Sequence, residues 1–127
     1  MGLLTLIDNK MNVRQEKINE LFKQEISKII LKEIKDPRLG FVTVQRVQTA
    51  RDMSYAKVYI TILGSEKDIQ KSLSVLNGAK EFIRIQLQKK IDIRYIPAPE
   101  FLIDTKIDDT LKLLNIIEKD KEEHGYE

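Results

Sequence analysis

The stretch Asp36-Pro37-Arg38-Leu39-Gly40 separates a helical pattern from a strand pattern in this 127-residue chain. Pro37 disfavours the α region at the residue before it and lacks a backbone donor, and Gly40 tolerates the positive φ of a sharp turn. A helix is therefore predicted to end here. A type I turn with Asp and Pro in its first two positions accounts for Asp36, Pro37 and Gly40. It leaves Arg38 unexplained, so Arg38 is a candidate for another role.

The sequence before this stretch has the spacing of a helix that buries one face. Its apolar residues recur three and four positions apart, which predicts an amphipathic helix. They are Ile18, Leu21, Phe22, Ile26, Ile29, Ile30 and Ile34. The first ten residues share neither this spacing nor its charge density, so we expect residues 1–11 to be a disordered N-terminal extension.

The sequence after it predicts a β-hairpin. Phe41 to Thr49 is rich in β-branched residues, residues 51–54 form a turn, and Tyr55 to Leu63 alternates apolar and polar side chains. Two strands joined by so short a connection pair antiparallel. The apolar face of the hairpin needs a cover that the first helix supplies, so the fold class is α+β.

A second helical region follows and contains a break. Ser65 and Asp68 form a capping-box pattern, and apolar residues keep helical spacing as far as Asn77-Gly78, where two poor helix formers predict a break or kink. The helical pattern then resumes with Phe82, Ile83 and Leu87 on the inner side. Lys80 and Arg84, four positions apart, point in the same direction.

The rest of the chain predicts one more strand and a tail. Residues 91–104 alternate in part, but Pro97 and Pro99 restrict them to an irregular strand at an edge or bulge. Apolar spacing in residues 107–117 predicts a short helix, and residues 118–127 are too charged to pack. We therefore expect one domain at 12–104, followed by a short helix and an acidic disordered tail at 105–127.

Composition excludes several function classes. The chain has no cysteine, and its one histidine, His124, lies in the charged tail, so neither a nucleophilic catalytic site nor a transition-metal site is expected. The carboxylates Asp104, Asp108 and Asp109 fit the start of a helix better than a metal or glycosidase pair. No apolar run reaches membrane-spanning length, no secretory signal or cofactor motif is present, and a cytoplasmic location is expected.

Charge divides the chain into a basic body and an acidic end. Residues 11–94 carry 17 Lys and Arg against 10 Asp and Glu, whereas residues 95–127 carry 4 against 9. Such a body favours a polyanionic partner, although many charged faces are only solvated. Nucleic acid is the leading candidate.

An ordered series of short stretches across residues 12–118 resembles the bacterial ribosome-binding factor A family. No single stretch is as specific as the series. Its members are Glu33 to Gly40, Val42-Thr43-Val44, Asp52, Ala56-Lys57-Val58-Tyr59, Phe82-Ile83-Arg84, Ile93-Arg94, Pro99-Glu100-Phe101 and Asp104.

The resemblance implies a type II KH-like domain in the order α-β-β-α-kink-α-β, with helices covering a three-stranded sheet. In this family an Ala-x-Gly kink joins the last two helices. Aligned on residues 82–84, the family's Ala falls on Ala79 and its Gly on Glu81, so the chain departs from the family at the glycine. The candidate kink residues are Asn77, Gly78, Ala79 and Glu81.

The resemblance also implies a non-enzymatic, monomeric factor without a cofactor. Such a factor binds the immature small (30S) ribosomal subunit and its 16S rRNA and assists late maturation, notably in the cold, with assembly GTPases as further candidate partners. Lys and Arg supply affinity by neutralising phosphates. The candidate phosphate contacts are Arg38, Arg46, Arg51, Lys57, Lys80, Arg84, Lys89, Lys90 and Arg94.

Other interpretations of the same residues remain open. Tyr55 and Tyr59 can stack on bases, but cross-strand packing is the preferred interpretation of these aromatic residues on the outer face of a strand. Alternatively, the chain is a protein-interaction module whose basic face is only solvated; its binding would then depend weakly on salt. A small enzyme with an unrecognised site would require a cluster of titratable groups that the residue inventory makes hard to build.

Overall fold

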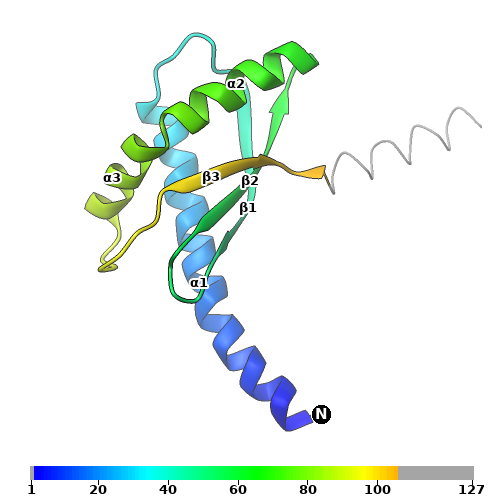
Figure 1. Cartoon of the computed structure of the whole chain (residues 1–127), viewed down its shortest axis with the longest axis vertical. Coiled ribbons are helices and arrows are strands. Elements are labelled where there is room, and N and C mark those ends of the chain that lie inside the picture. Colours follow the sequence, from blue (N-terminus) through cyan, green and yellow to red (C-terminus); the bar gives the residue numbers. More distant parts are fainter. Residues whose placement is uncertain (1, 106–127) are drawn as a thin grey trace, which may run out of the picture.

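The structure is a computed structural model that describes the backbone of residues 2–105 and the side chains of residues 13–105. Its elements follow the predicted order and form an α+β fold (Figure 1). They are α1 (Gly2–Glu33), β1 (Phe41–Thr49), β2 (Ala56–Leu63), α2 (Glu66–Gly78), α3 (Lys80–Lys90) and β3 (Pro99–Ile103). The helix and tail predicted after residue 105 lie outside the described residues.

Helix α1 is longer than the sequence pattern indicated. It ends at Glu33, shortly before the Asp36–Gly40 stretch where its end was predicted, but it begins at Gly2, so residues 2–11 continue the helix where a disordered extension was expected. Charge density and apolar spacing set these residues apart, but no proline interrupts the backbone hydrogen bonds between Gly2 and Glu33. The N-terminal part of α1 extends well beyond the sheet (Figure 1).

The stretch after α1 forms the predicted turn, but Gly40 has a different role from the one expected. The Leu39 N–H donates to the Asp36 carbonyl at 3.0 Å, which closes the turn. Among the described residues only Gly64 is a glycine with positive φ, so Gly40 does not use the left-handed region. Its N–H donates to Ser72 Oγ at 2.8 Å, and a Cβ at position 40 would lie 3.3 Å from that oxygen. Gly40 therefore permits the strand to approach α2 closely.

The sheet contains three strands in the order β1-β2-β3. β1 and β2 form the predicted antiparallel hairpin, with a bulge at Gln45 that places Arg46 opposite Tyr59. β3 pairs parallel to β2 from Ala56↔Pro99 to Ile60↔Ile103. It is shorter than the predicted strand because a proline lacks the N–H that a ladder needs, and Pro99 begins the strand at the edge of the sheet.

Helices cover one face of the sheet. α1 packs on β1, while α2 and α3 contact β3. The inward side chains of β2 are buried and alternate with half-buried ones on the opposite, open face, as the sequence predicts. The core also receives fully buried Phe22 and Ile26 from α1, Leu76 from α2, and Ile83 and Leu87 from α3.

The helical region 66–90 is divided at Ala79. The capping box at the start of α2 is present, since Ser65 Oγ accepts from the Asp68 N–H and the Asp68 carboxylate accepts from the Ser65 N–H. Ala79 has φ −99° and ψ 6°, and its N–H donates to the carbonyls of Val75 and Leu76. The break follows directly after Asn77-Gly78, and Glu81 lies in the first turn of α3. α3 therefore starts in a new direction (Figure 1).

Candidate nucleic-acid interface

Helix α3 buries two apolar side chains and carries basic side chains on more than one side. Ile83 and Leu87 are fully buried and fix the helix against the core. Lys80, Lys89 and Lys90 are exposed, Arg84 is half-buried, and Arg94 is exposed in the loop that follows. The structure thus brings five of the nine predicted phosphate contacts onto one helix and its following loop. We call them the α3 basic surface: Lys80, Arg84, Lys89, Lys90 and Arg94.

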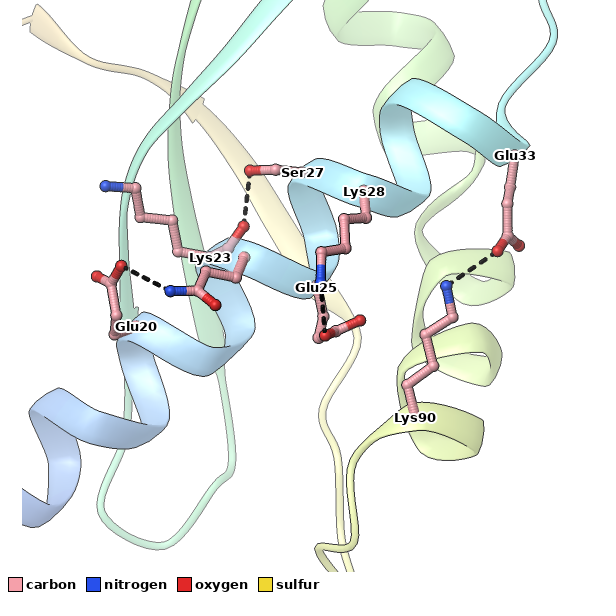
Figure 2. A network of polar contacts seen from close by, with 8 residues as sticks. Glu20, Lys23, Glu25, Ser27, Lys28, Glu33 and Lys90 are labelled. Atoms are coloured by element: carbon pink, nitrogen blue, oxygen red, sulfur yellow. Dashed lines mark hydrogen bonds and ion pairs between the residues drawn. The ribbon is translucent and has the colours of Figure 1, made fainter.

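Two members of the α3 basic surface have intramolecular partners. The Arg84 guanidinium donates to the Glu81 carboxylate, with Nε 2.7 Å from Oε1. This hydrogen bond lowers the pKa of Glu81 and is the main cause that raises the pKa of Arg84, with a smaller contribution from nearby Tyr95. Lys90 Nζ lies 3.0 Å from Glu33 Oε1 and joins the end of α3 to the end of α1 (Figure 2).

The other three members lack an ion pair within residues 13–105: Lys80, Lys89 and Arg94. Surface lysines and arginines are hydrated until a partner arrives. These three cations are therefore available to phosphate groups without the loss of an internal contact.

Within residues 13–33, the charged side of α1 has one ion pair within the helix and two further local polar contacts. Lys28 Nζ lies 3.5 Å from Glu25 Oε1, and the Gln24 amide lies 3.4 Å from the Glu20 carboxylate (Figure 2). Ser27 Oγ donates to the Lys23 carbonyl at 2.7 Å. These contacts fit the prediction that this side of α1 is a solvated surface with pairs three and four residues apart.

Arg46 is a predicted phosphate contact that lies in the open face of the sheet among its own partners. Its guanidinium carbon lies 3.7 Å from the centre of the Tyr59 ring, and its Nε lies 3.9 Å from Asp104 Oδ2. That Nε is buried and has no hydrogen-bond acceptor among the described residues. Asp104 is only 3% exposed. Arg46 therefore covers Tyr59 and balances the charge of a buried carboxylate.

Arg51 and Lys57 lie near the turn of the hairpin. Arg51 is exposed in the turn itself, and Lys57 Nζ lies 5.4 Å from the centre of the Tyr55 ring. The pairing Ala56↔Pro99 puts this turn at the same end of the sheet as the loop that carries Arg94. Arg51 and Arg94 thus extend one basic end of the molecule.

Arg38 has a local partner. Its guanidinium lies 2.8 Å from Asp36 Oδ2, and its N–H donates to Asp36 Oδ1 at 2.9 Å. These hydrogen bonds hold the pKa of Asp36 at about 2. The residue that the turn pattern left unexplained thus closes the turn through its side chain.

Tyr95 and Phe82 are surface aromatic residues that the sequence analysis did not propose as ligand contacts. Tyr95 is 66% exposed beside Arg84, and Phe82 is 41% exposed on α3 although an inward position was predicted. Aromatic rings beside cations can stack on unpaired bases. Helical spacing could not reveal the exposure of Phe82, because it depends on how far the core extends around α3, and Tyr95 lies in the loop after α3, where no spacing pattern applies.

Two features are absent from the described part of the chain. Within it, no three His, Cys, Asp or Glu side chains gather in a way that could hold a metal ion. None of its helices combines the length and apolar character that a membrane crossing requires.

Sequence comparisons agree with these observations. The family profile of ribosome-binding factor A matches residues 14–117. The ribosome-binding factor A of Carboxydothermus hydrogenoformans is 40% identical over 112 residues, covering 88% of this chain and 90% of the relative. That of Thermodesulfovibrio yellowstonii is 44% identical over 113 residues, covering 87% of this chain and 95% of the relative.

Solved structures give the same result. The crystal structure of ribosome-binding factor A from Thermus thermophilus matches with a TM-score of 0.63 at 26% identity, covering 70% of this chain and 93% of that one. A homology model of the T. thermophilus protein fitted into a cryo-EM map of a 30S complex matches with a TM-score of 0.56 at 27% identity, covering 66% and 88%. Fold, profile and relatives together show that this chain belongs to the ribosome-binding factor A family.

Proposed function

We propose that this chain is a non-enzymatic, cytoplasmic assembly factor that binds the small ribosomal subunit through 16S rRNA and assists its late maturation, including at low temperature. Membership of the ribosome-binding factor A family and the 30S complex of a relative support subunit binding. The observation that carries the RNA contact is the α3 basic surface, where three cations have no ion pair among the described residues.

The α3 basic surface suits phosphate binding better than base recognition. Lys80 and Lys89 lie roughly 13 Å apart along the axis of α3 and on different sides of it, so each would contact a different phosphate group. Lysine binds phosphate as a point charge and gains affinity from counterion release. Binding of this kind recognises the shape of RNA, with Tyr95 available for an unpaired base.

The rigid support of these cations explains how binding can act without chemistry. Four of the five basic residues lie on a helix that fully buried Ile83 and Leu87 fix against the core. A preorganised set of charges favours the RNA arrangement that matches it, and a ligand shifts a conformational equilibrium by its difference in affinity for the two states. The factor would thus stabilise one rRNA arrangement during maturation. Arg51 and Lys57 extend the contact at the hairpin end.

Co-sedimentation with purified small subunits over a salt series tests the RNA contact. The variant Lys80→Glu/Lys89→Glu/Arg94→Glu should lose on the order of a hundredfold in affinity and lower the salt slope by about 2, since each phosphate contact contributes roughly 0.7–0.9. The matched control Arg14→Glu/Lys17→Glu/Lys67→Glu changes the same number of exposed charges elsewhere.

Two results would contradict the proposal. Equal losses in the two triple variants would mean that only net charge matters. Binding that ignores salt and survives ribonuclease treatment would favour the protein-interaction alternative. For the maturation role, the control variant should restore 16S rRNA processing at low temperature in cells that lack the factor, and the α3 variant should not.

A further inference from the structure

A groove lies between the end of α1, the turn that follows it and the start of the edge strand β1. The cavity measures about 620 Å³, and its apolar lining includes Ile30, Leu31 and Ile34 from α1, Leu39 from the turn, and Phe41 and Val42 from β1. Leu31 is 80% exposed and Phe41 is 71% exposed. Exposed apolar surface of this kind marks a contact site. We call it the α1–β1 groove.

The edge of this groove carries two lysines and one carboxylate. Lys35 and Asp36 line the cavity, Asp36 is already bonded to Arg38, and Lys32 is exposed on the last turn of α1. Neither lysine has an ion pair among residues 13–105. An occupant that combines apolar anchors with acidic flanks would therefore complement both the lining and the edge.

The chain beyond the described residues starts close to this groove. The pairings Ile103↔Ile60 and Val44↔Ile60 place the end of β3 two strands away from Val44, which lines the groove. Two strand spacings are about 10 Å. Twenty-two residues follow Thr105. The eight residues that follow Ile103, up to Leu111, can span roughly 26 Å, enough to pass over the edge of β1.

The sequence of this segment has the required character. Its apolar positions Ile107, Leu111, Leu114 and Ile117 have helical spacing, which gives one apolar side. Residues 106–127 contain seven acidic and four basic residues, including an acidic cluster after Ile117. An amphipathic segment that binds a groove uses anchors three and four positions apart, as Leu111 and Leu114 are.

We propose that residues 107–117 of this chain dock into its own α1–β1 groove, with Leu111 and Leu114 against Leu31 and Phe41, and with acidic neighbours facing Lys32 and Lys35. The groove is separate from the α3 basic surface. Leu31 lines the groove, whereas Glu33, two positions on and on the opposite side of α1, bonds Lys90 of α3. The docked segment covers the exposed apolar surface and leaves the RNA contact open.

Disulfide trapping in the full-length chain tests this docking, because the chain has no native cysteine. Leu31→Cys with Leu114→Cys should form an intramolecular disulfide under mild oxidation at least ten times faster than two control pairs. The controls combine Leu114→Cys with Lys89→Cys on the α3 basic surface or with Arg51→Cys in the hairpin turn. All three partner positions are exposed, so the substitutions should not disturb the fold.

Each other outcome contradicts the proposal in a recognisable way. Equal rates for the three pairs would mean that the segment does not dock, and faster trapping at Lys89→Cys would place it over the α3 basic surface. A disulfide-linked dimer would mean that the occupant comes from a second copy.

A third substitution shows whether apolar anchoring causes the trapping. Adding Leu111→Asp to the Leu31→Cys/Leu114→Cys pair should reduce its rate to that of the controls, whereas adding Thr110→Asp should not. The same loss with both would contradict apolar docking. These readouts need no RNA, so failure of the docking proposal leaves the proposed function intact.

Discussion

The basic residues of α3 and those of the open sheet face look alike in the sequence, but the structure gives them different surroundings. Arg46 stacks on Tyr59 and lies 3.9 Å from a buried carboxylate, whereas Lys80, Lys89 and Arg94 have no ion pair among the described residues. A cation already surrounded by partners stabilises the fold, and a cation in water remains available to a ligand. The difference shows that neighbours decide which arginines and lysines belong to a binding surface.

Arg84 lies between these two cases. Its partner Glu81 is 62% exposed, and an exposed pair of this kind contributes only about 0–1 kcal/mol in water. A phosphate could replace Glu81 at little cost. Arg46 could not be recruited in this way, because moving it would uncover Tyr59 and leave the charge of Asp104 without its nearby guanidinium.

The largest expected effect is a difference in stability between substitutions on the inner and outer sides of α3. Ile83→Ala removes a fully buried side chain and should lower the free energy of unfolding by about 3 kcal/mol, since Ile→Ala in a core costs roughly 2–5 kcal/mol. Ile85→Ala, on the same helix but 41% exposed, should cost less than about 1 kcal/mol. Urea unfolding measures both. Equal losses would contradict the assignment of an inner and an outer side.

The next effect tests the structural role of Arg46. Arg46→Ala removes the ring contact and the positive charge near Asp104, and should lower the free energy of unfolding by about 2 kcal/mol. Its binding to small subunits should keep the salt slope of the wild type. A lower salt slope with unchanged stability would show that Arg46 contacts RNA, and Arg46 would then not differ from the α3 basic surface.

Local features of the fold could be predicted because they depend on near neighbours in the sequence. Alternation in Tyr55 to Leu63 identified the buried side of β2, and Asn77-Gly78 lies directly before the break at Ala79. The capping box of Ser65 and Asp68 needs only three residues. In each case the interacting groups are so close in the chain that spacing determines the geometry.

The partners of Lys90 and Arg46 could not be predicted, because they come from distant parts of the chain. The Lys90–Glu33 pair joins residues 57 positions apart. Arg46 meets Tyr59 only because the bulge at Gln45 shifts the register of the hairpin, and it meets Asp104 only because β3 pairs parallel to β2. Residue type alone therefore led to the prediction that both Arg46 and Lys80 contact phosphate.

A smaller effect on binding is expected when Arg84 loses its partner Glu81. Glu81→Gln removes a competing carboxylate and should tighten binding to small subunits about two- to threefold at low salt, because an exposed pair contributes only a few tenths of a kcal/mol. Glu66→Gln is the matched control, an acidic residue in the first turn of α2. An equal gain in both variants would mean that only net charge changed.

The smallest effect concerns the partnered cation Arg38. Hydrogen bonds from Arg38 hold the pKa of Asp36 at about 2, below its ordinary value of 3.8. A lowered pKa means that the ionised carboxylate stabilises the fold above pH 3.8, and that this contribution is lost as the pH falls from 3.8 towards 2. In Arg38→Ala the pKa of Asp36 should return towards its ordinary value, which an NMR titration of the carboxyl carbon would measure. Because Arg38 is already paired, the same variant should bind small subunits nearly as well as the wild type. A loss of affinity as large as that of the α3 triple variant would show that a cation with an internal partner still contacts RNA.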